Sequence, residues 1–260
     1  MKKMPVLFVG HGSPMIALED SDLTRKFKEV GDEIIEKFQS PKALLVISAH
    51  WYTNDTFIQS DSSPRQIYDM YGFPEELYQL KYPALGDIDL TNRVKELLGD
   101  SVDLNDQWGI DHGTWSVLVH MFPKADIPVV QLSVNRKLDE RESFKLGEKL
   151  SPLRDEGYLI IGSGNIVHNL REANFHSDKG SIRADEFDEF ILENVLNKNY
   201  ENILNYEENK NSFYAVPTKD HFLPFIYSLG ASLKDDVEVF NNLRTLDSIS
   251  MTSYVFGMTP

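Results

Sequence analysis

The sequence contains no cysteine, and this absence removes several kinds of chemistry at once. Without thiols the chain cannot form disulfides, thiolate metal ligands, iron–sulfur clusters or a cysteine nucleophile. Any metal ion must therefore be bound by nitrogen and oxygen atoms. The sequence also lacks a GK[ST] phosphate loop, a Gly-x-Ser-x-Gly turn and an H-E-x-x-H helix, so it favours neither nucleotide binding, nor a serine nucleophile, nor a common metalloprotease site.

Clusters of basic residues and long apolar runs are missing as well. With 26 basic against 41 acidic residues the formal net charge is −15, which repels a phosphate backbone and argues against nucleic acid as a partner. No apolar run approaches the roughly 20 residues that cross a bilayer. Because a strand and a glycine turn, not an apolar signal core, follow Lys2 and Lys3, we expect no membrane span and a cytoplasmic protein.

The apolar residues that are present fall into short runs separated by helical patterns. A length of 260 residues fits one large domain, spanning residues 1–260. Buried strands are predicted at 6–9, 42–50, 127–134 and 158–161, with closing strands at 237–240 and 250–256. Helices are predicted at 20–38, 89–98, 139–150, 184–194 and 217–230. This alternation predicts an α/β fold with a mixed, mostly parallel central sheet flanked by helices.

Two of the predicted strands end on a histidine. His11 follows the first strand and is set between Gly10 and Gly12, and His50 ends the second. In open α/β sheets, ligands bind in the crevice outside the carboxyl ends of the strands. If both strands lie in one parallel sheet, the two imidazoles project into the same crevice, where a metal site can assemble. The alternative is that each histidine only hydrogen-bonds a turn.

Five of the seven histidines lie at a strand end, a glycine turn or a helix start: His11, His50, His112, His168 and His221. His120, within a predicted helix, is interpreted as a core residue, and His176, in a polar loop, as a solvated one. Imidazole and carboxylate without thiolate favour zinc or non-haem Fe(II) as the metal.

Aromatic residues gather in a long predicted loop at 62–85, which includes Tyr68, Tyr71 and Phe73, and Trp51 follows His50 directly. Such residues can form a wall for a flat ligand, or they can be a small separate core that holds the loop together. Asp111 likewise has two interpretations, because it can act in a site beside His112 or simply cap the helix that begins near Thr114.

Seven motifs together resemble the 4,5-DOPA extradiol dioxygenase family. They are HGSPM at 11–15, SAHW at 48–51, YDMYGFPEELY at 68–78, DHGTW at 111–115, IPVVQLS at 127–133, GSGNIVHNL at 162–170 and DHFLPF at 220–225. They cover nearly the whole chain in order. The family belongs to the class III extradiol ring-cleavage dioxygenases and is similar to the β subunit of protocatechuate 4,5-dioxygenase, so the resemblance implies a mixed α/β fold of phosphorylase/hydrolase-like topology.

The resemblance also implies roles for the histidines. His11 and His50 match the two strand-end metal ligands of the superfamily, and His221 lies where the superfamily supplies a glutamate ligand. With this departure, three histidines would bind the metal in place of the usual two histidines and one carboxylate. His168 matches the acid/base histidine, and His112 is implied to hydrogen-bond a catechol oxygen or dioxygen.

The implied activity is cleavage of a catechol such as DOPA by O₂, giving a muconic semialdehyde-type product. Fe(II) is the expected metal, and Zn(II) fits the same ligands. Trp51, Tyr68, Tyr71 and Phe73 are predicted to contact the ring, with Asp111 on the substrate side. A zinc hydrolase and a non-catalytic protein that binds a metal or an aromatic ligand are the alternatives, and association into a homo-oligomer is left open.

Overall fold

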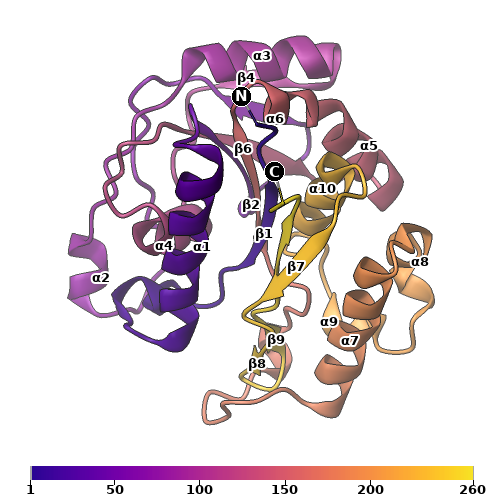
Figure 1. The fold of residues 1–260 in the computed structure, drawn as a ribbon. Helices are drawn as coiled ribbons and strands as arrows, with labels where there is room; N and C mark the ends of the chain where they lie inside the picture. Colours follow the sequence, from indigo (N-terminus) through magenta and orange to yellow (C-terminus); the bar gives the residue numbers. More distant parts are fainter. Residues whose placement is uncertain (1, 260) are drawn as a thin grey trace.

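The computed structural model describes residues 2–259. Its centre is an eight-stranded mixed sheet in the order β4-β3-β5-β2-β6-β1-β10-β7 (Figure 1). The strands are β1 Val6–Gly10, β2 Leu44–Thr53, β3 Phe57–Gln59, β4 Asp103–Asn105, β5 Val129–Asn135, β6 Leu159–Gly164, β7 Val237–Phe240 and β10 Ser253–Phe256. Neighbours among β5, β2, β6 and β1 are parallel, so the carboxyl ends of these four strands meet at one edge.

Helices cover both faces of this sheet. The helices of residues 2–259 are α1 Asp22–Phe38, α2 Glu75–Gln79, α3 Ile88–Leu98, α4 His112–Met121, α5 Glu140–Leu150, α6 Pro152–Asp155, α7 Ile182–Leu196, α8 Tyr200–Leu204, α9 Ser212–Ala215 and α10 Leu223–Ser232. The apolar faces of α1 and α4 pack on one side, and those of α3, α5 and α10 on the other. The result is a three-layer α/β fold, as predicted from the sequence.

In the first strand, β1, apolar and polar residues do not alternate, because both of its faces are buried. Val6 and Phe8 belong to the core on the side of α5 and α10, whereas Leu7 and Val9 belong to the core on the side of α1. All four side chains are fully buried. A strand covered by helices on both faces reads as a continuous apolar run.

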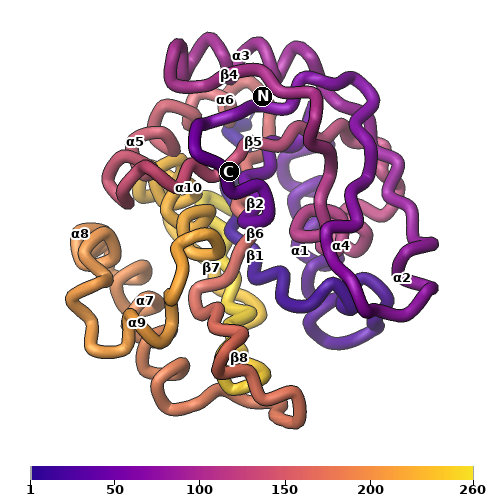
Figure 2. Tube along the Cα trace, turned by 180° about the vertical axis from the view of Figure 1, so that it is seen from behind, coloured from indigo at the N-terminus to yellow at the C-terminus, as the bar shows by residue number. Residues whose placement is uncertain are grey.

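Part of the last third of the chain extends beyond the carboxyl ends of the parallel strands. Helices α7, α8 and α9 lie there together with a small hairpin of β8 Arg244–Thr245 and β9 Ile249–Ser250 (Figure 2). Two short 3-10 helices, η3 Leu170–Glu172 and η4 Tyr206–Glu208, connect these parts, and a third, η1 Pro14–Leu18, follows β1 on the opposite side of the crevice. No helix within residues 2–259 combines the length and apolarity that crossing a membrane requires.

Two sequence-based boundaries were wrong in a way that affects the site. The strand predicted at 158–161 continues to Gly164, so that Gly162 and Gly164 lie within β6. A Cβ at these two positions would come within 2.4 Å of the Pro224 carbonyl oxygen and 2.1 Å of the His221 carbonyl oxygen, so only glycine fits there. The helix predicted from residue 217 begins only at Leu223. His221 therefore lies in the turn before α10, where its carbonyl accepts a 2.9 Å hydrogen bond from the backbone nitrogen of Asn165, directly after β6.

Candidate metal centre

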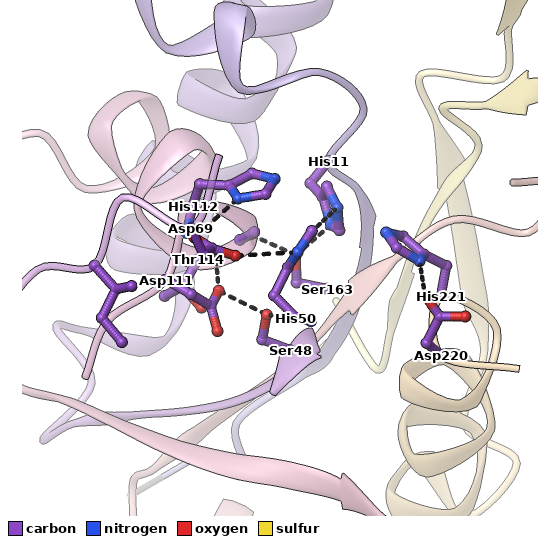
Figure 3. A network of polar contacts seen from close by, with 12 residues as sticks. His11, Ser48, His50, Asp69, Asp111, His112, Thr114, Ser163, Asp220 and His221 are labelled. Carbon is purple, nitrogen blue, oxygen red and sulfur yellow. Dashed lines mark hydrogen bonds and ion pairs between the residues drawn. The ribbon is translucent and has the colours of Figure 1, made fainter. Parts of the chain in front are cut away.

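Five histidines meet at the carboxyl edge of the parallel strands, although they come from five separate segments. His11 directly follows β1, and His112 begins α4. His50 lies within β2, at a point where the pairing with β5 shifts register between Ser48 and Tyr52. Such an irregularity re-aims a strand side chain. His221 precedes α10 on the opposite side of the group (Figure 3), and His168 follows β6.

The proton of the His11 ring is assigned by its neighbour. His11 Nδ1 lies 3.0 Å from Ser163 Oγ, and that hydroxyl donates its only hydrogen to the carbonyl oxygen of Gly113 at 2.5 Å. Ser163 can therefore only accept from His11, which places the proton on Nδ1. The lone pair of His11 is left on Nε2, which faces the other histidines.

A single carboxylate supports two further rings. Asp69 Oδ2 lies 3.1 Å from His50 Nδ1. Asp69 Oδ1 accepts a 3.0 Å hydrogen bond from the backbone nitrogen of His112 and lies 3.0 Å from its Nδ1, although without hydrogen-bond alignment to the latter. Burial raises the pKa of Asp69, but the close contacts with the His112 and His50 rings outweigh it and hold the pKa well below its usual range. Asp69 is thus an anion that keeps the Nδ1 proton on His50.

The arrangement of His11 and His50 fits a bound cation. Their Nε2 atoms are 3.0 Å apart, and in both rings Nδ1 is taken by an acceptor. Two facing lone pairs at this distance need a proton or a metal ion between them. At a metal–nitrogen distance of about 2.1 Å, a 3.0 Å separation corresponds to a ligand–metal–ligand angle of roughly 90°. Burial and the other histidines lower the pKa of His11, which favours the unprotonated ring that a metal requires.

Two histidines compete for the third ligand position. His11, His50 and His112 each offer a nitrogen within 4.8 Å of the other two. His221 is not in that set, but its ring centre lies 5.2 Å from those of both His11 and His50, which are 5.0 Å apart. Three imidazoles around one ion have ring centres about 5 Å apart. The centre of the His112 ring lies 3.8 Å from that of His50 but 5.9 Å from that of His11, so its spacing from the two is unequal.

A second carboxylate orients His221. Its Nδ1 lies 2.6 Å from Asp220 Oδ2, which leaves Nε2 directed toward His11 and His50 (Figure 3). Burial lowers the pKa of His221 despite the neighbouring carboxylate, so the ring is neutral. A histidine whose other nitrogen donates to a carboxylate is the usual form of a metal-binding imidazole.

His168 stands beside this group and outside its centre. Its ring stacks on that of His221 at 3.5 Å and 7°. Its backbone nitrogen donates to the Ala215 carbonyl, and residue 168 also pairs with Ile249 of β9, so its position is fixed on both sides. Burial, followed by electrostatic repulsion from the neighbouring His221 ring, lowers the pKa of His168, so that the ring is neutral near pH 7.

A cavity of about 700 Å³ opens in front of the five histidines, and all five line it. Tyr71 and Phe73, predicted as ring contacts, also line it, with Tyr71 92% exposed at the rim. The other two histidines lie elsewhere. His176 is exposed, as predicted, whereas His120 is only partly buried and contacts the carbonyl oxygen of Ile16.

Three further residues predicted near the substrate do not line the cavity. Trp51 is buried and stacks on Trp108. Tyr68 donates from its hydroxyl to the Leu80 carbonyl, which makes it part of the packing of the long loop. Asp111 is fully buried as the cap of α4, so the capping interpretation is the one the structure supports.

Sequence reasoning missed the residues that hold the histidines. Asp69, Ser163 and Asp220 carry the supporting hydrogen bonds, yet none was predicted as a site residue. Asp69 lies between Tyr68 and Tyr71 in a motif that drew attention only for its aromatic residues. Asp220 had a local signal, because a carboxylate directly beside a candidate ligand is well placed to orient it. Ser163 had none.

Gly113 shows how tightly the centre is packed. A Cβ at this position would lie 2.7 Å from the His50 ring and 2.9 Å from Ser48 Oγ. The first turn of α4 can pass behind the metal centre only because residue 113 has no side chain. Ser48 in turn donates to Asp111 at 2.7 Å, which ties the cap of α4 to β2.

The fold and the site together define an α/β protein with a non-haem metal centre made of histidines at the carboxyl ends of parallel strands. Residues 5–257 match the family model LigB, described as the catalytic LigB subunit of aromatic ring-opening dioxygenase. The chain belongs to the LigB family, and it is an extradiol, ring-cleaving dioxygenase.

Relatives with an assigned activity agree with the family and the activity, and a solved structure agrees with the fold. The chain is 41% identical over 235 residues to 4,5-DOPA dioxygenase extradiol of Escherichia coli, covering 88% of this chain and 85% of the relative. It is 40% identical to 4,5-DOPA dioxygenase extradiol of Beta vulgaris, covering 97% and 96%. The crystal structure of an uncharacterized Escherichia coli protein superposes with a TM-score of 0.85 at 36% identity, covering 98% of this chain and 100% of the other.

Proposed function

We propose that this dioxygenase opens the ring of a catechol of the DOPA type with Fe(II) as its metal, giving a muconic semialdehyde-type product. The observation that carries the proposal is the pair of Nε2 atoms of His11 and His50, 3.0 Å apart with both Nδ1 atoms held by acceptors. The names of the relatives support the substrate class. A cytoplasmic location is a prediction from the sequence.

Three histidines would hold the metal: His11, His50 and His221. The support for His221 is the nearly equal spacing of the three rings and the hydrogen bond of its Nδ1 to Asp220. Non-haem Fe(II), when bound, supplies a centre that orients a catechol and O₂ toward each other. Zn(II) also fits three imidazole nitrogens.

His168 is the proposed acid/base. Its neutral ring lines the cavity and stacks on a proposed ligand, so it can accept a proton from a catechol hydroxyl on one of its ring nitrogens and return it when the ring opens. His112 also lines the cavity and would hydrogen-bond a catechol oxygen. Its backbone nitrogen donates to Asp69 at 3.0 Å.

Apolar side chains form the remainder of the wall. Met70, Phe73, Ile249 and Met251 line the cavity and can pack on the faces and edges of an aromatic ring. They also exclude water from the reacting atoms, which strengthens polar interactions there.

The test is the coupling of oxygen uptake to ring opening. Protein loaded anaerobically with Fe(II) is mixed with a panel of small catechols, and oxygen consumption and semialdehyde absorbance are followed together. We expect one O₂ consumed for each ring opened, and no uptake by the zinc-loaded protein. Turnover of an amide or ester without oxygen would instead identify a zinc hydrolase, and catechol binding with no turnover of any kind would identify a binding protein.

A further inference from the structure

The wall of the catechol cavity carries very little charge. Among the described residues that line it, Glu19 is the only carboxylate, and no lysine or arginine is present. Glu19 is exposed to solvent. Glu19 has no ion pair within residues 2–259. The nearest basic side chain in the sequence, Arg25, is paired instead with Asp20 at 2.8 Å and with Asp22 at 3.0 Å.

Glu19 borders the same cavity as the histidines, where it can meet the side chain of a bound catechol. It follows η1, the 3-10 helix that begins three residues after His11. Glu19 and all five histidines line one cavity of about 700 Å³, so a catechol held at the histidines shares that cavity with the Glu19 carboxylate.

We propose that Glu19 binds the ammonium group of the substrate and makes the enzyme prefer catechol amines to catechol carboxylates. This inference rests on the proposed function, because it concerns the same cavity. A carboxylate on the substrate chain meets no lysine or arginine in the wall, so a catechol amine without one should bind at least as well as DOPA.

Equilibrium binding to the zinc-loaded protein tests this without turnover. The probes are dopamine, DOPA, dihydroxyphenylpropionate and the neutral ethylcatechol. We expect dopamine to bind about fivefold more tightly than ethylcatechol, and the propionate about fivefold more weakly, as for one partly exposed ion pair. Glu19→Gln should abolish both differences. Glu36→Gln, which removes an exposed carboxylate of α1 outside the cavity wall, should retain them.

The outcomes separate this inference from the proposed function. Equal affinities for the charged and neutral catechols, or equal effects of the two glutamine substitutions, would overturn the role of Glu19 even if Fe(II)-loaded protein opens every ring. A preference that depends on Glu19, in a protein that opens no catechol ring with oxygen, would support the ammonium site and refute the activity.

Discussion

At the scale of single residues, the metal centre depends on the hydrogen bonds that assign each imidazole proton. Ser163 is the simplest case, because it fixes His11 and contacts no other candidate ligand. Ser163→Ala removes the acceptor for Nδ1 and lets the ring take the other tautomer. We expect metal affinity to fall about 10- to 100-fold, measured by competition with a chelator. Ser116→Ala, which removes a buried hydroxyl that has no partner, should leave affinity unchanged.

The third ligand is decided by comparing two alanine variants. If His221 completes the site, His221→Ala should lose most of its bound metal, whereas His112→Ala should keep it and bind catechols more weakly. Metal content after gel filtration is the measurement, with circular dichroism as the check on folding. Loss of metal only in His112→Ala would assign the third position to His112, the residue nearer to His50.

Asp69 gives a prediction about pH. Its pKa is lower in the folded protein than in the unfolded chain, so the folded state binds fewer protons there, and the stabilisation is present above pH about 4 and lost as the pH falls below it. The loss in free energy of unfolding caused by Asp69→Asn should therefore shrink between pH 7 and pH 3.5 in urea titrations. A constant difference would contradict it. Asp100→Asn, at an exposed carboxyl, is the control.

At the scale of elements, the β8–β9 hairpin forms part of the cavity wall and is fastened to α7 by one buried carboxylate. Asp188 of α7 accepts hydrogen bonds from Arg244 at 2.9 Å, Ser250 at 2.8 Å and Thr252 at 2.6 Å. Burial raises the pKa of Asp188 even with these donors present. The positive charge of Arg244 therefore stabilises the ionised form of the buried Asp188 carboxylate.

Arg244→Ala should destabilise both the fold and the cavity wall. We expect a loss of about 3 kcal/mol in the free energy of unfolding, since one partner of a buried pair is removed, together with a higher KM for catechols. Arg141→Ala breaks an exposed pair with Glu201 and should cost much less, because water already solvates both groups. Equal losses in the two variants would show that Asp188 does not need its partner.

The elements themselves were largely predictable from sequence. Helix α1 begins with a capping box at Ser21, and the core strands are continuous apolar runs, so local pattern and tertiary burial agree. Prediction failed where distant segments met. Gly162 and Gly164 indicate a turn when considered alone, but both pair within the sheet, and they are glycines because Pro224 and His221 approach them too closely for a side chain. The two-residue strands β8 and β9 are too short to show the alternation of apolar and polar residues by which a strand is predicted.

At the scale of the whole molecule, the five candidate histidines were predictable because strand ends and glycines marked them, and the parallel sheet brought them together. The supporting residues were not predictable in the same way. Ser163 acts on His11 across 152 positions of sequence, and only the register of β1 beside β6 brings the two together. The substrate wall likewise draws on segments from η1 to the β8–β9 hairpin, so single aromatic residues such as Trp51 and Tyr68 could not be placed correctly from sequence.

The central claim is a division of labour between histidines that hold the metal and His168, which moves a proton. The most direct test loads His168→Ala and His11→Ala anaerobically with Fe(II), measures bound iron and the optical change on adding a catechol, and then admits oxygen. We expect His168→Ala to keep its iron and bind the catechol while ring opening slows by about 10²- to 10⁴-fold, and His11→Ala to lose iron and activity together. Loss of iron from His168→Ala to the same degree as from His11→Ala would contradict the account and make His168 a ligand.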